Sequence, residues 1–514
     1  MFSMALVNKL THHFNSRAAA RTLSYLSIHC FVAIAYVYGL HTHSSLASCV
    51  AVICLMALYT LAQPHPSRLL SLTLVNTLLL FLSSYWLIYP LQDMIQIHPV
   101  VGALSILIAA GLISTLLTIP VLMYHRRLPW TIAPISCSFF CIFGEYLRQQ
   151  TIIATPWMNV SNLAFNIPIL NNALPIGGGI LTGYLLLRLA ETIVTVLRGQ
   201  IDKDGRQVFA IYALLAMSSV YMSCVTWFNT STNSNQSLLT VNLLQGNINP
   251  LEKRDNYLNW EEQAHLIHQQ HPRNLNILSE GVLSIDKESL PLHKFRTYSF
   301  LKNSIIGLNY VDGKKYQSML IGVNKVHGRY TKQHYVPFGE YLPLQSMFSW
   351  YTDFFDDKRT PTTDNNNTII SYGRFHLYPM ICYDLFFEPN TRKLINNADA
   401  IIVIAENTWF HDSMMQKSFV RAAQLRALEY RLPILLVMNR GYTAHISADG
   451  RIVEQLPYDT QQVLHTTVAK RIRTTNALMY LKDYQVLIGI LLLEIIGSVV
   501  ILRLSNQVKQ RAQS

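Results

Sequence analysis

Three residues in the second half of the chain are of types that together support nucleophilic catalysis. Glu280 and Cys382 each follow a short apolar run, and Lys332 shortly precedes the turn-forming segment Tyr335–Glu340. A cysteine nucleophile requires a base to form its thiolate and a positive or hydrogen-bond-donating group to hold the oxyanion that follows. Active sites of α/β proteins are built at strand ends, so these side chains are candidates for such a site. Taken singly, Glu280 or Lys332 is more simply a solvated charge, and spacing alone does not overturn that interpretation.

The segment that carries these candidates has the pattern of an α/β domain. Its apolar, partly β-branched runs predict buried strands at Leu238–Leu244, Leu275–Leu278, Ser304–Tyr310, Gln317–Val323, Phe375–Cys382, Ala400–Ile404 and Ile434–Met438. Polar, helix-compatible stretches separate these runs. The clearest is Ser413–Tyr430, with Asp412 or Ser413 as its N-terminal cap. Alternating strands and helices over 238–475 therefore predict an α/β layered domain.

The remainder of the chain has the character of a membrane protein. The sequence is 50% hydrophobic and only 14% charged, which is too apolar for a soluble protein of this length. Its long apolar stretches are 24–40, 45–62, 69–89, 99–124, 129–147, 176–197, 207–228 and 484–504. Each approaches the ~20 residues needed to cross a bilayer, so we expect a membrane domain over 1–230 with about seven transmembrane helices and a C-terminal transmembrane helix over 484–504.

Basic residues alternate between the segments that join these spans. They occur in every second one of these segments. The basic residues are, in order, Lys9, Arg17 and Arg21, then Arg68, then Arg126 and Arg127, then Arg198, Lys203 and Arg206, and finally Arg503, Lys509 and Arg511. Segments 41–44 and 90–98 contain none, and Arg148 is the one discordant charge. The positive-inside rule therefore predicts a multi-pass membrane protein with both termini in the cytoplasm and 238–475 on the outer face of the membrane.

The net charge of +12 does not indicate a nucleic-acid partner. The excess of basic residues lies in the membrane part, and the 238–475 segment has no basic stripe. The 18 histidines also show no metal-ligand spacing such as H-E-x-x-H.

Cysteine usage singles out Cys382. The other six cysteines, Cys30, Cys49, Cys54, Cys137, Cys141 and Cys224, all fall within expected spans. A lone thiol in an exported domain has no disulfide partner in that domain and is a candidate reactive group. A buried cysteine packed as a small hydrophobe is the alternative.

A family resemblance connects these candidates. The matching motifs are Glu145-Tyr-Leu-Arg148, Pro156-Trp157, Gln245-Gly-Asn247, Glu280, Lys332, Val336-Pro-Phe-Gly-Glu340, Cys382-Tyr383, Asn407-Thr-Trp-Phe410, Arg426-Ala-Leu-Glu429 and Asn439. In this order they resemble the apolipoprotein N-acyltransferases, a membrane-embedded branch of the nitrilase superfamily. The lysine followed closely by Val-Pro-Phe-Gly-Glu is the most specific part.

The resemblance implies both a fold and a set of roles. It implies that 238–475 is a nitrilase-like α-β-β-α sandwich, with Glu280 as general base, Lys332 as oxyanion stabiliser and Cys382 as nucleophile. Glu340 and Tyr383 would be supporting residues. It implies no metal and no organic cofactor.

The resemblance also implies the reaction and its partners. Cys382 would take an acyl chain from a phospholipid as a thioester and pass it to the N-terminal amine of a lipid-modified apolipoprotein, so the implied partners are a phospholipid donor, an apolipoprotein acceptor and the membrane that holds both. The chain departs from the family at Ser279, Arg254, Asp384 and His411. Two alternatives remain: a membrane-tethered nitrilase-like amidase or acyltransferase that acts on a different amine, and a non-catalytic scaffold.

Three further features lie outside these motifs. The aromatic stretch Met347–Phe355 is either a lid that dips into the membrane interface or an ordinary packed loop. Arg188 and Glu191 are three residues apart in an expected span, which favours a structural pair. Glu494, in the last span, has no partner that the sequence identifies.

Overall fold

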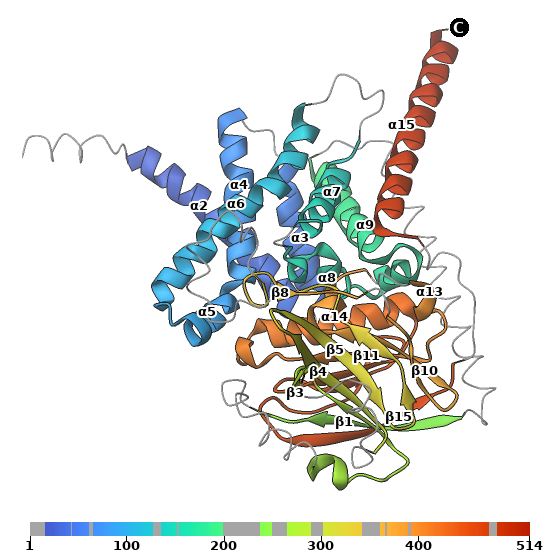
Figure 1. The fold of residues 1–514 in the computed structure, drawn as a ribbon. Coiled ribbons are helices and arrows are strands. Elements are labelled where there is room, and N and C mark those ends of the chain that lie inside the picture. The colour runs from blue at the N-terminus through green and yellow to red at the C-terminus, as the bar shows by residue number, and fades with distance from the viewer. Residues whose placement is uncertain are drawn as a thin grey trace, which may run out of the picture.

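A computed structural model describes residues 16–42, 44–60, 65–126, 135–151, 154–198, 237–248, 265–288, 302–341, 360–364, 367–388, 392–471 and 481–513. The structure has a helical region, drawn above, and a domain of two β-sheets, drawn below (Figure 1). The last helix, α15 (Asp483–Gln513), leaves the sheet domain and runs up beside the helical region.

The helical region consists mainly of apolar helices. They are α2 (Ser16–His41), α3 (Ser45–Thr60), α4 (His65–Ser83), η1 (Tyr85–Leu87), α5 (Ile88–Ile95), α6 (Pro99–Arg126), α7 (Cys137–Gln149), η2 (Pro156–Met158), α8 (Val160–Ala164), η3 (Pro168–Ala173) and α9 (Leu174–Leu197). Within the described residues, Pro99–Tyr124 and Pro168–Leu197 are long and apolar enough to cross a membrane. They correspond to the expected spans 99–124 and 176–197, whereas the expected span 207–228 lies outside the described residues.

The other expected spans differ in length or shape. Leu26–His41 and Ser45–Thr60 are shorter apolar helices, and α7 has only 13 residues. The expected span over 69–89 is broken, because Arg68–Ser83 and Tyr85–Asp93 are bent by 54°. The indole N–H of Trp86 donates to the Ser83 carbonyl at 3.0 Å, which occupies an oxygen that a continuous helix would use for its own backbone.

Buried charges connect the helices to one another. The expected pair of Arg188 and Glu191 is present at 3.3 Å. Glu191 also accepts from the backbone N–H groups of Cys137 and Ser138 at 3.0 and 3.1 Å, where the first turn of α7 has unsatisfied donors. Glu494 of α15 has partners too, since Ser136 donates to it through its backbone N–H at 2.9 Å and through its hydroxyl.

The α/β domain contains two sheets. The first has the order β15-β1-β2-β4-β5-β7, with β3 paired to β4 and β8 to β5, and the second has the order β14-β13-β12-β11-β10-β9-β6. The first sheet comprises β1 (Leu238–Gln245), β2 (Leu275–Leu278), β3 (Leu283–Asp286), β4 (Ser304–Asp312), β5 (Lys315–Val323), β7 (Arg329–Thr331), β8 (Thr360–Pro361) and β15 (Gln462–Ala469). The second comprises β6 (Val326–His327), β9 (Ile370–Tyr372), β10 (Phe375–Ile381), β11 (Ala400–Ala405), β12 (Ile434–Met438), β13 (Ala444–Ile446) and β14 (Ile452–Gln455).

Side-chain alternation explains why strands of the first sheet are apolar throughout. Leu243 and Ile277 belong to the large core cluster shared with the second sheet. Their neighbours Leu244 and Leu278 belong to a separate cluster on the other face, which also contains Ile267. Successive strand residues point to opposite faces, so both faces of this sheet are covered. Segments 249–264 and 289–301, where the expected second helical layer falls in chain order, lie outside the described residues.

Helix α14 (Met414–Tyr430) lies between the sheets and the helical region (Figure 1). Its predicted extent is confirmed, and the Ser413 hydroxyl caps it by accepting from the Met415 N–H at 3.2 Å. Arg421 projects from this helix to the Asn166 side-chain oxygen at 2.7 Å and over the Phe165 ring at 4.3 Å. The helical region and the α/β domain are therefore joined by specific buried contacts.

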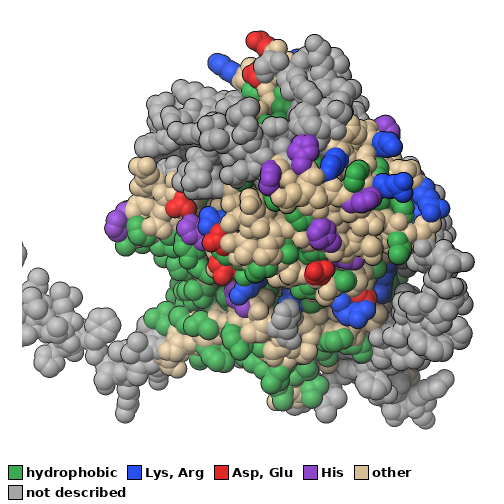
Figure 2. All heavy atoms as spheres, turned by 90° about the horizontal axis from the view of Figure 1, so that it is seen from below, with side chains coloured by type: hydrophobic (Ala, Val, Ile, Leu, Met, Phe, Trp, Pro, Cys, Tyr) green, Lys and Arg blue, Asp and Glu red, His purple; other side chains and the backbone are tan. Residues whose placement is uncertain are grey.

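The face of the α/β domain seen from below carries mixed charges (Figure 2). Lys, Arg, Asp, Glu and His side chains are interspersed there among other polar atoms, and hydrophobic side chains gather toward one border. On the helical region, large apolar side chains such as Leu104, Ile108 and Leu112 of α6 are more than half exposed. Contiguous apolar exposure of this kind is typical of a surface that faces lipid.

Candidate active site

Glu280 lies two residues beyond β2, at the edge where the two sheets meet. Its carboxylate accepts from the Ser318 hydroxyl at 3.2 Å and from the Glu406 backbone N–H at 3.0 Å. A Cβ built on Gly307 would lie 2.4 Å from the Ser279 carbonyl oxygen, so only glycine permits β4 to approach this segment so closely. Gly307 therefore determines how closely β4 packs against the segment that carries Glu280.

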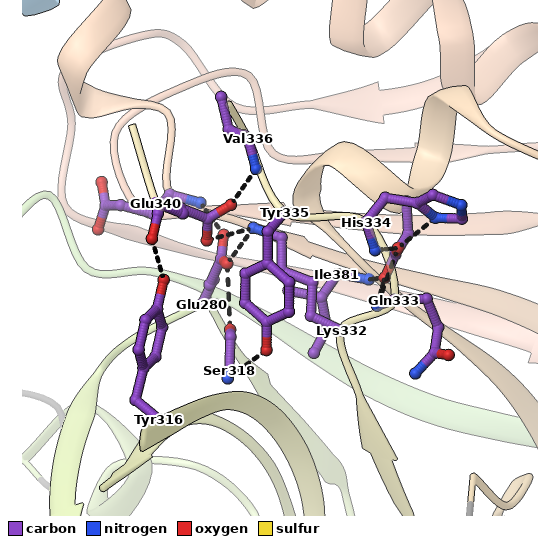
Figure 3. A network of polar contacts seen from close by, with 12 residues as sticks. Glu280, Tyr316, Ser318, Lys332, Gln333, His334, Tyr335, Val336, Glu340 and Ile381 are labelled. Carbon is purple, nitrogen blue, oxygen red and sulfur yellow. Dashed lines mark hydrogen bonds and ion pairs between the residues drawn. The ribbon is translucent and has the colours of Figure 1, made fainter. Parts of the chain in front are cut away.

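Lys332 follows β7 and lies in the centre of the site. Its ammonium is 2.9 Å from Glu280 Oε1 and 2.8 Å from Glu340 Oε1, and the residue is only 1% exposed. Burial alone would lower the pKa of Lys332, but Cys382, Glu280 and Glu340 together raise it well above its usual value. The lysine is thus a buried permanent cation between two carboxylates (Figure 3).

Glu340 is held by the turn that begins at Val336. Its Oε2 accepts from the Val336 backbone N–H at 2.6 Å, and its own N–H donates to the Val336 carbonyl at 2.9 Å. Phe338, inside this turn, has a φ of 64°. Burial raises the pKa of the Glu340 carboxyl, and the Lys332 ammonium opposes that effect.

Cys382 occupies the sharp turn between β10 and the 3-10 helix η7 (Cys382–Phe386). Its φ is 50°, in the region that favours glycine, and such strain in a non-glycine residue is concentrated at functional sites. Burial raises the pKa of its thiol well above the usual value, the Glu280 carboxylate raises it further, and the Lys332 ammonium opposes both. The resting group is therefore a neutral thiol beside a base and a cation.

Asp384 connects the turn after Cys382 to the segment after Lys332. Its carboxylate accepts from the His334 N–H at 2.8 Å, from His334 Nδ1 at 2.9 Å and from the Tyr330 hydroxyl at 3.0 Å. The His334 ring also stacks on Phe387 at 4.3 Å. This departure from the family pattern thus occupies a structural position.

A second clamp on the same turn comes from α14. Arg426 donates to the carbonyls of Leu385 and Phe387 at 3.0 and 2.9 Å and pairs with Glu429 at 2.5 Å. Glu429 in turn lies 3.1 Å from the point where a Cβ on Gly178 would be, and Gly178, with a φ of 59°, interrupts α9. The Arg426-to-Glu429 motif therefore holds the nucleophile turn against the helical region.

Tyr383 also connects the two regions. Its hydroxyl donates to the Ala154 carbonyl at 2.7 Å, and its ring contacts Phe387 at 4.8 Å. A cavity of about 610 Å³ adjoins this contact; it is lined by Gln149, Gln150, Thr151, Ala154, Gln333, His334, Tyr335, Pro337, Tyr341, Pro361, Tyr383, Phe387, Glu388, Lys482 and Asp483. Four of these side chains, those of His334, Glu388, Lys482 and Asp483, are acidic or basic.

The structure thus brings together all five residues that the sequence nominated: Glu280, Lys332, Glu340, Cys382 and Tyr383. The aromatic stretch Met347–Phe355 and Arg254 lie outside the described residues. Several contributors were missed, namely Ser318, the backbone of Glu406, and the bonding roles of Asp384 and Arg426. Asp384 and Arg426 carried a signal in the sequence, since Asp384 stands two residues after the cysteine and Arg426 opens a matching motif, whereas Ser318 and Glu406 carried none.

The arrangement is suited to covalent catalysis of acyl transfer. A thiol at a strained turn, a carboxylate base and a buried ammonium provide a nucleophile, a proton acceptor and a stabiliser of an oxyanion. A group of three His, Cys, Asp or Glu residues that could hold a metal ion does not occur within the described residues.

Comparison with known families and proteins agrees with both halves of the structure. Residues 30–191 match the model of the apolipoprotein N-acyltransferase N-terminal domain, and residues 305–477 match carbon-nitrogen hydrolase. The second match begins after Glu280 and includes Lys332, Glu340 and Cys382.

Individual relatives align over most of the chain. The apolipoprotein N-acyltransferase of Haemophilus ducreyi is 25% identical over 378 residues, 67% of this chain and 72% of its own length. That of Pseudomonas syringae pv. tomato is 25% identical over 403 residues, 73% and 78% of the two chains. That of Nitrosomonas europaea is 25% identical over 452 residues, 79% and 84%. The chain is therefore similar to the apolipoprotein N-acyltransferases over most of its length, with the N-terminal-domain match in its first half and the carbon-nitrogen hydrolase match in its second.

Proposed function

We propose that this protein transfers an acyl chain from a phospholipid, through a thioester on Cys382, to the N-terminal amine of a diacylglyceryl-cysteine lipoprotein. The observation that carries the proposal is the buried row of Glu280, Lys332 and Glu340, joined by contacts of 2.9 and 2.8 Å, beside the thiol of Cys382. The family relationship supplies the substrates, and the site supplies the chemistry.

In the first half-reaction, Glu280 takes the proton of the Cys382 thiol as the sulfur attacks an ester carbonyl of the phospholipid. The carbonyl oxygen becomes an oxyanion, which the ammonium of Lys332 stabilises. The tetrahedral species then expels the glycerol oxygen, which takes the proton from Glu280 and leaves as a lysophospholipid. The acyl group remains on sulfur as a thioester.

In the second half-reaction, the amine of the acceptor attacks the thioester. Glu280 takes a proton from the attacking nitrogen, Lys332 again stabilises the oxyanion, and the thiolate of Cys382 leaves. That thiolate recovers the proton from Glu280, so the products are the amide and the original thiol. Two steps at one nucleophile allow two bulky lipids to use the site in turn.

The cavity beside Tyr383 supports this proposal, because it offers room for the polar part of a lipid substrate. His334, Glu388, Lys482 and Asp483 line it together with aromatic side chains. Such a mixture suits a ligand with an apolar body and a charged end.

We also propose a multi-pass arrangement in the inner membrane, with both termini cytoplasmic and the α/β domain periplasmic. The proposed limits are a membrane domain over 1–230 with about seven spans, a catalytic domain over 238–475 and a final span over 484–504. Contacts between the two regions support it, since Asp93 bonds to His411, Ala154 to Tyr383 and Asn166 to Arg421. All three helical-region residues lie in the segments between expected spans, 90–98 and 148–175, that the charge pattern assigns to the outer side.

The test of the function is mass spectrometry of the purified full-length protein incubated with phospholipid and no acceptor. We expect a hydroxylamine-sensitive acyl adduct on Cys382 that is absent from Cys382→Ala. Cys49→Ala, which removes a partly buried cysteine far along the chain from the site, is the matched control and should keep the adduct. Addition of a diacylglyceryl-cysteine peptide should then discharge the adduct and yield an amide.

The other outcomes are distinguishable. An adduct that a diacylglyceryl-cysteine peptide does not discharge would favour an acyltransferase that acts on a different amine. Absence of any adduct with all phospholipids tested would contradict the proposal and favour the amidase or the scaffold.

A further inference from the structure

His411 has a backbone conformation that residues other than glycine rarely adopt. It follows the 3-10 turn η8 (Thr408–Phe410) with a φ of 49° and a ψ of −166°. This region of the backbone map favours glycine, and another residue remains there only where surrounding contacts fix it. The contacts made by the His411 side chain therefore require an explanation.

Those contacts are made to a single short helix of the helical region. Nε2 of His411 is 2.7 Å from Asp93 Oδ2, and the imidazole stacks on Tyr89 with the ring centres 4.7 Å apart and the planes 17° apart. Asp93 and Tyr89 both belong to α5 (Ile88–Ile95), one turn apart and hence on the same helix face. The strained residue thus lies against a two-point site on α5.

The residue before it makes a contact in the same direction. Phe410 packs edge-on against Trp86 with ring centres 4.8 Å apart, and Trp86 packs edge-on against Trp157 at 5.0 Å. Trp86 and Trp157 belong to the helical region, in η1 and η2 respectively. Phe410 and His411, two consecutive residues of the α/β domain, therefore both pack against elements of the helical region.

The other end of this loop is at the candidate base. The Glu406 backbone N–H donates to Glu280 Oε2 at 3.0 Å. The Glu406 carboxylate is itself held by the Thr408 hydroxyl at 2.6 Å and by the Asn439 amide at 3.0 Å. Residues 406–411 thus form one short, internally bonded connection between the Glu280 carboxylate and helix α5.

From this continuity we infer that His411 is a positioning residue for acyl transfer: by binding α5 it fixes the loop that holds Glu280 at the distance from Cys382 required for proton transfer. The inference rests on the proposed function. Because α5 is the second limb of the pair bent by 54°, the packing of the helical region sets the position of the base. Displacing Glu280 slows the chemical step and leaves lipid binding unchanged.

The experiment uses the full-length protein in lipid nanodiscs and three substitutions. Asp93→Ala removes the partner of His411, and Asp93→Asn retains an oxygen that can accept from the imidazole. Asp459→Ala is the control, since it breaks an ion pair with Arg440 of similar exposure and a contact of 2.6 Å that lies wholly within the α/β domain. The readouts are the first-order rate of Cys382 acylation at saturating phospholipid, the phospholipid concentration at half-saturation, and the rate of Cys382 alkylation by iodoacetamide without lipid.

For Asp93→Ala we expect acylation about five- to tenfold slower, the size expected for loss of a partly exposed charged hydrogen bond, with half-saturation unchanged. Alkylation should become faster, because a displaced Glu280 no longer disfavours the thiolate. Asp93→Asn should restore most of the acylation rate, and Asp459→Ala should match the parent in all three readouts.

Two results would overturn the inference. Equal acylation and alkylation rates in Asp93→Ala and Asp459→Ala would exclude a positioning role, and a change in half-saturation alone would assign α5 to lipid binding. If the parent protein forms no adduct, the proposed function fails, and the alkylation rates still show whether α5 fixes Glu280.

Discussion

At the scale of single residues, the charges around Cys382 determine which proton transfers the site can perform. With both carboxylates ionised, Glu280, Lys332 and Glu340 carry a single net negative charge beside a neutral thiol. Moving the thiol proton to Glu280 leaves that net charge unchanged, whereas losing it to water would add a second negative charge in a buried site. Creating a net charge away from water is costly, so transfer within the cluster is the favoured route.

Glu280→Gln is therefore expected to change two reactions of Cys382 in opposite directions. Burial and the Glu280 carboxylate hold the pKa of the thiol above its usual value, so the thiolate fraction at a given pH is lower than for an ordinary cysteine. Alkylation of the parent by iodoacetamide should keep rising with pH beyond the ordinary cysteine pKa of about 8.5. In Glu280→Gln the rise should occur at lower pH, while acylation by phospholipid should fall by roughly 10²- to 10⁴-fold as the base is lost.

The measurement is a pair of rate profiles between about pH 6.5 and pH 10, which brackets the ordinary pKa. Glu454→Gln, on the exposed strand β14, is the matched control and should follow the parent. Slower alkylation in Glu280→Gln would show that the carboxylate acts mainly as a proton acceptor for the thiol rather than through its charge.

At the scale of secondary-structure elements, the nucleophile turn is held from two sides. Asp384 connects it to the segment after β7, and Arg426 connects it to α14, which packs against α9 of the helical region. The ion pair of Arg426 and Glu429 is buried, with 16% and 9% of the two side chains exposed. Removing the arginine leaves a buried carboxylate and two carbonyls without their donor.

Arg426→Ala is therefore expected to destabilise the protein by about 3–5 kcal/mol, the usual result of removing one partner of a buried ion pair. Arg451→Ala, which breaks a pair whose arginine is 82% exposed, should change stability by less than about 0.5 kcal/mol because water screens it. Thermal unfolding in the same detergent compares the two. Equal midpoints for both variants would mean that the clamp on the nucleophile turn contributes nothing to stability.

The same scale shows what the sequence could predict. Each of the seven expected strands occurs in the structure, because each is an apolar run covered on at least one face. The polar, alternating strand β15 was missed, since only Leu464 and Val468 among its residues are buried. Strand β14 was missed because all four of its residues are exposed. Strands β14 and β15 both form by hydrogen bonding to a neighbouring strand, and a hydrophobicity pattern does not show such pairing.

The candidate site was predictable to a similar degree. Residues that act through distinctive side chains in motifs, such as Lys332 and Cys382, were nominated through the family resemblance. Ser318 and the backbone of Glu406 were not, because their bonds to Glu280 form only when segments far apart in the sequence come together in the fold. The break in the expected span over 69–89 was missed for the same reason: a tryptophan side chain competes for a helix carbonyl only after folding.

At the scale of the whole molecule, the α/β domain is fastened to one end of the helical region. Asn166 lies at the centre of this junction: it accepts from Arg421 of α14 and donates to the carbonyls of Gly39 and Thr42. At the opposite end, Arg198 donates to the Thr60 carbonyl at 3.2 Å. The two ends of the helical region are therefore chemically distinct.

This polarity predicts the labelling of single cysteines introduced into a variant without native cysteines. Asp312→Cys, on an exposed strand end of the α/β domain, should react with a membrane-impermeant maleimide in cells whose outer membrane is permeabilised. Arg198→Cys should react only after the inner membrane is opened, because the positive-inside rule assigns that end to the cytoplasm. The reverse pattern would contradict the proposed orientation.

The contacts of Glu494 bear on how the protein is made. The Ser136 N–H and the Tyr184 hydroxyl both donate to this carboxylate, at 2.9 and 2.6 Å, and Glu494 lies on a helix that the ribosome synthesises after the whole α/β domain. Until that helix is inserted, the Glu494 carboxylate is not available to these two donors. An unsatisfied polar group inside a membrane costs several kcal/mol. These contacts of the helical bundle are thus completed only after the whole intervening domain has been translated. Chains that stop early would present incomplete bundles to membrane proteases, so degradation would select for full-length enzyme.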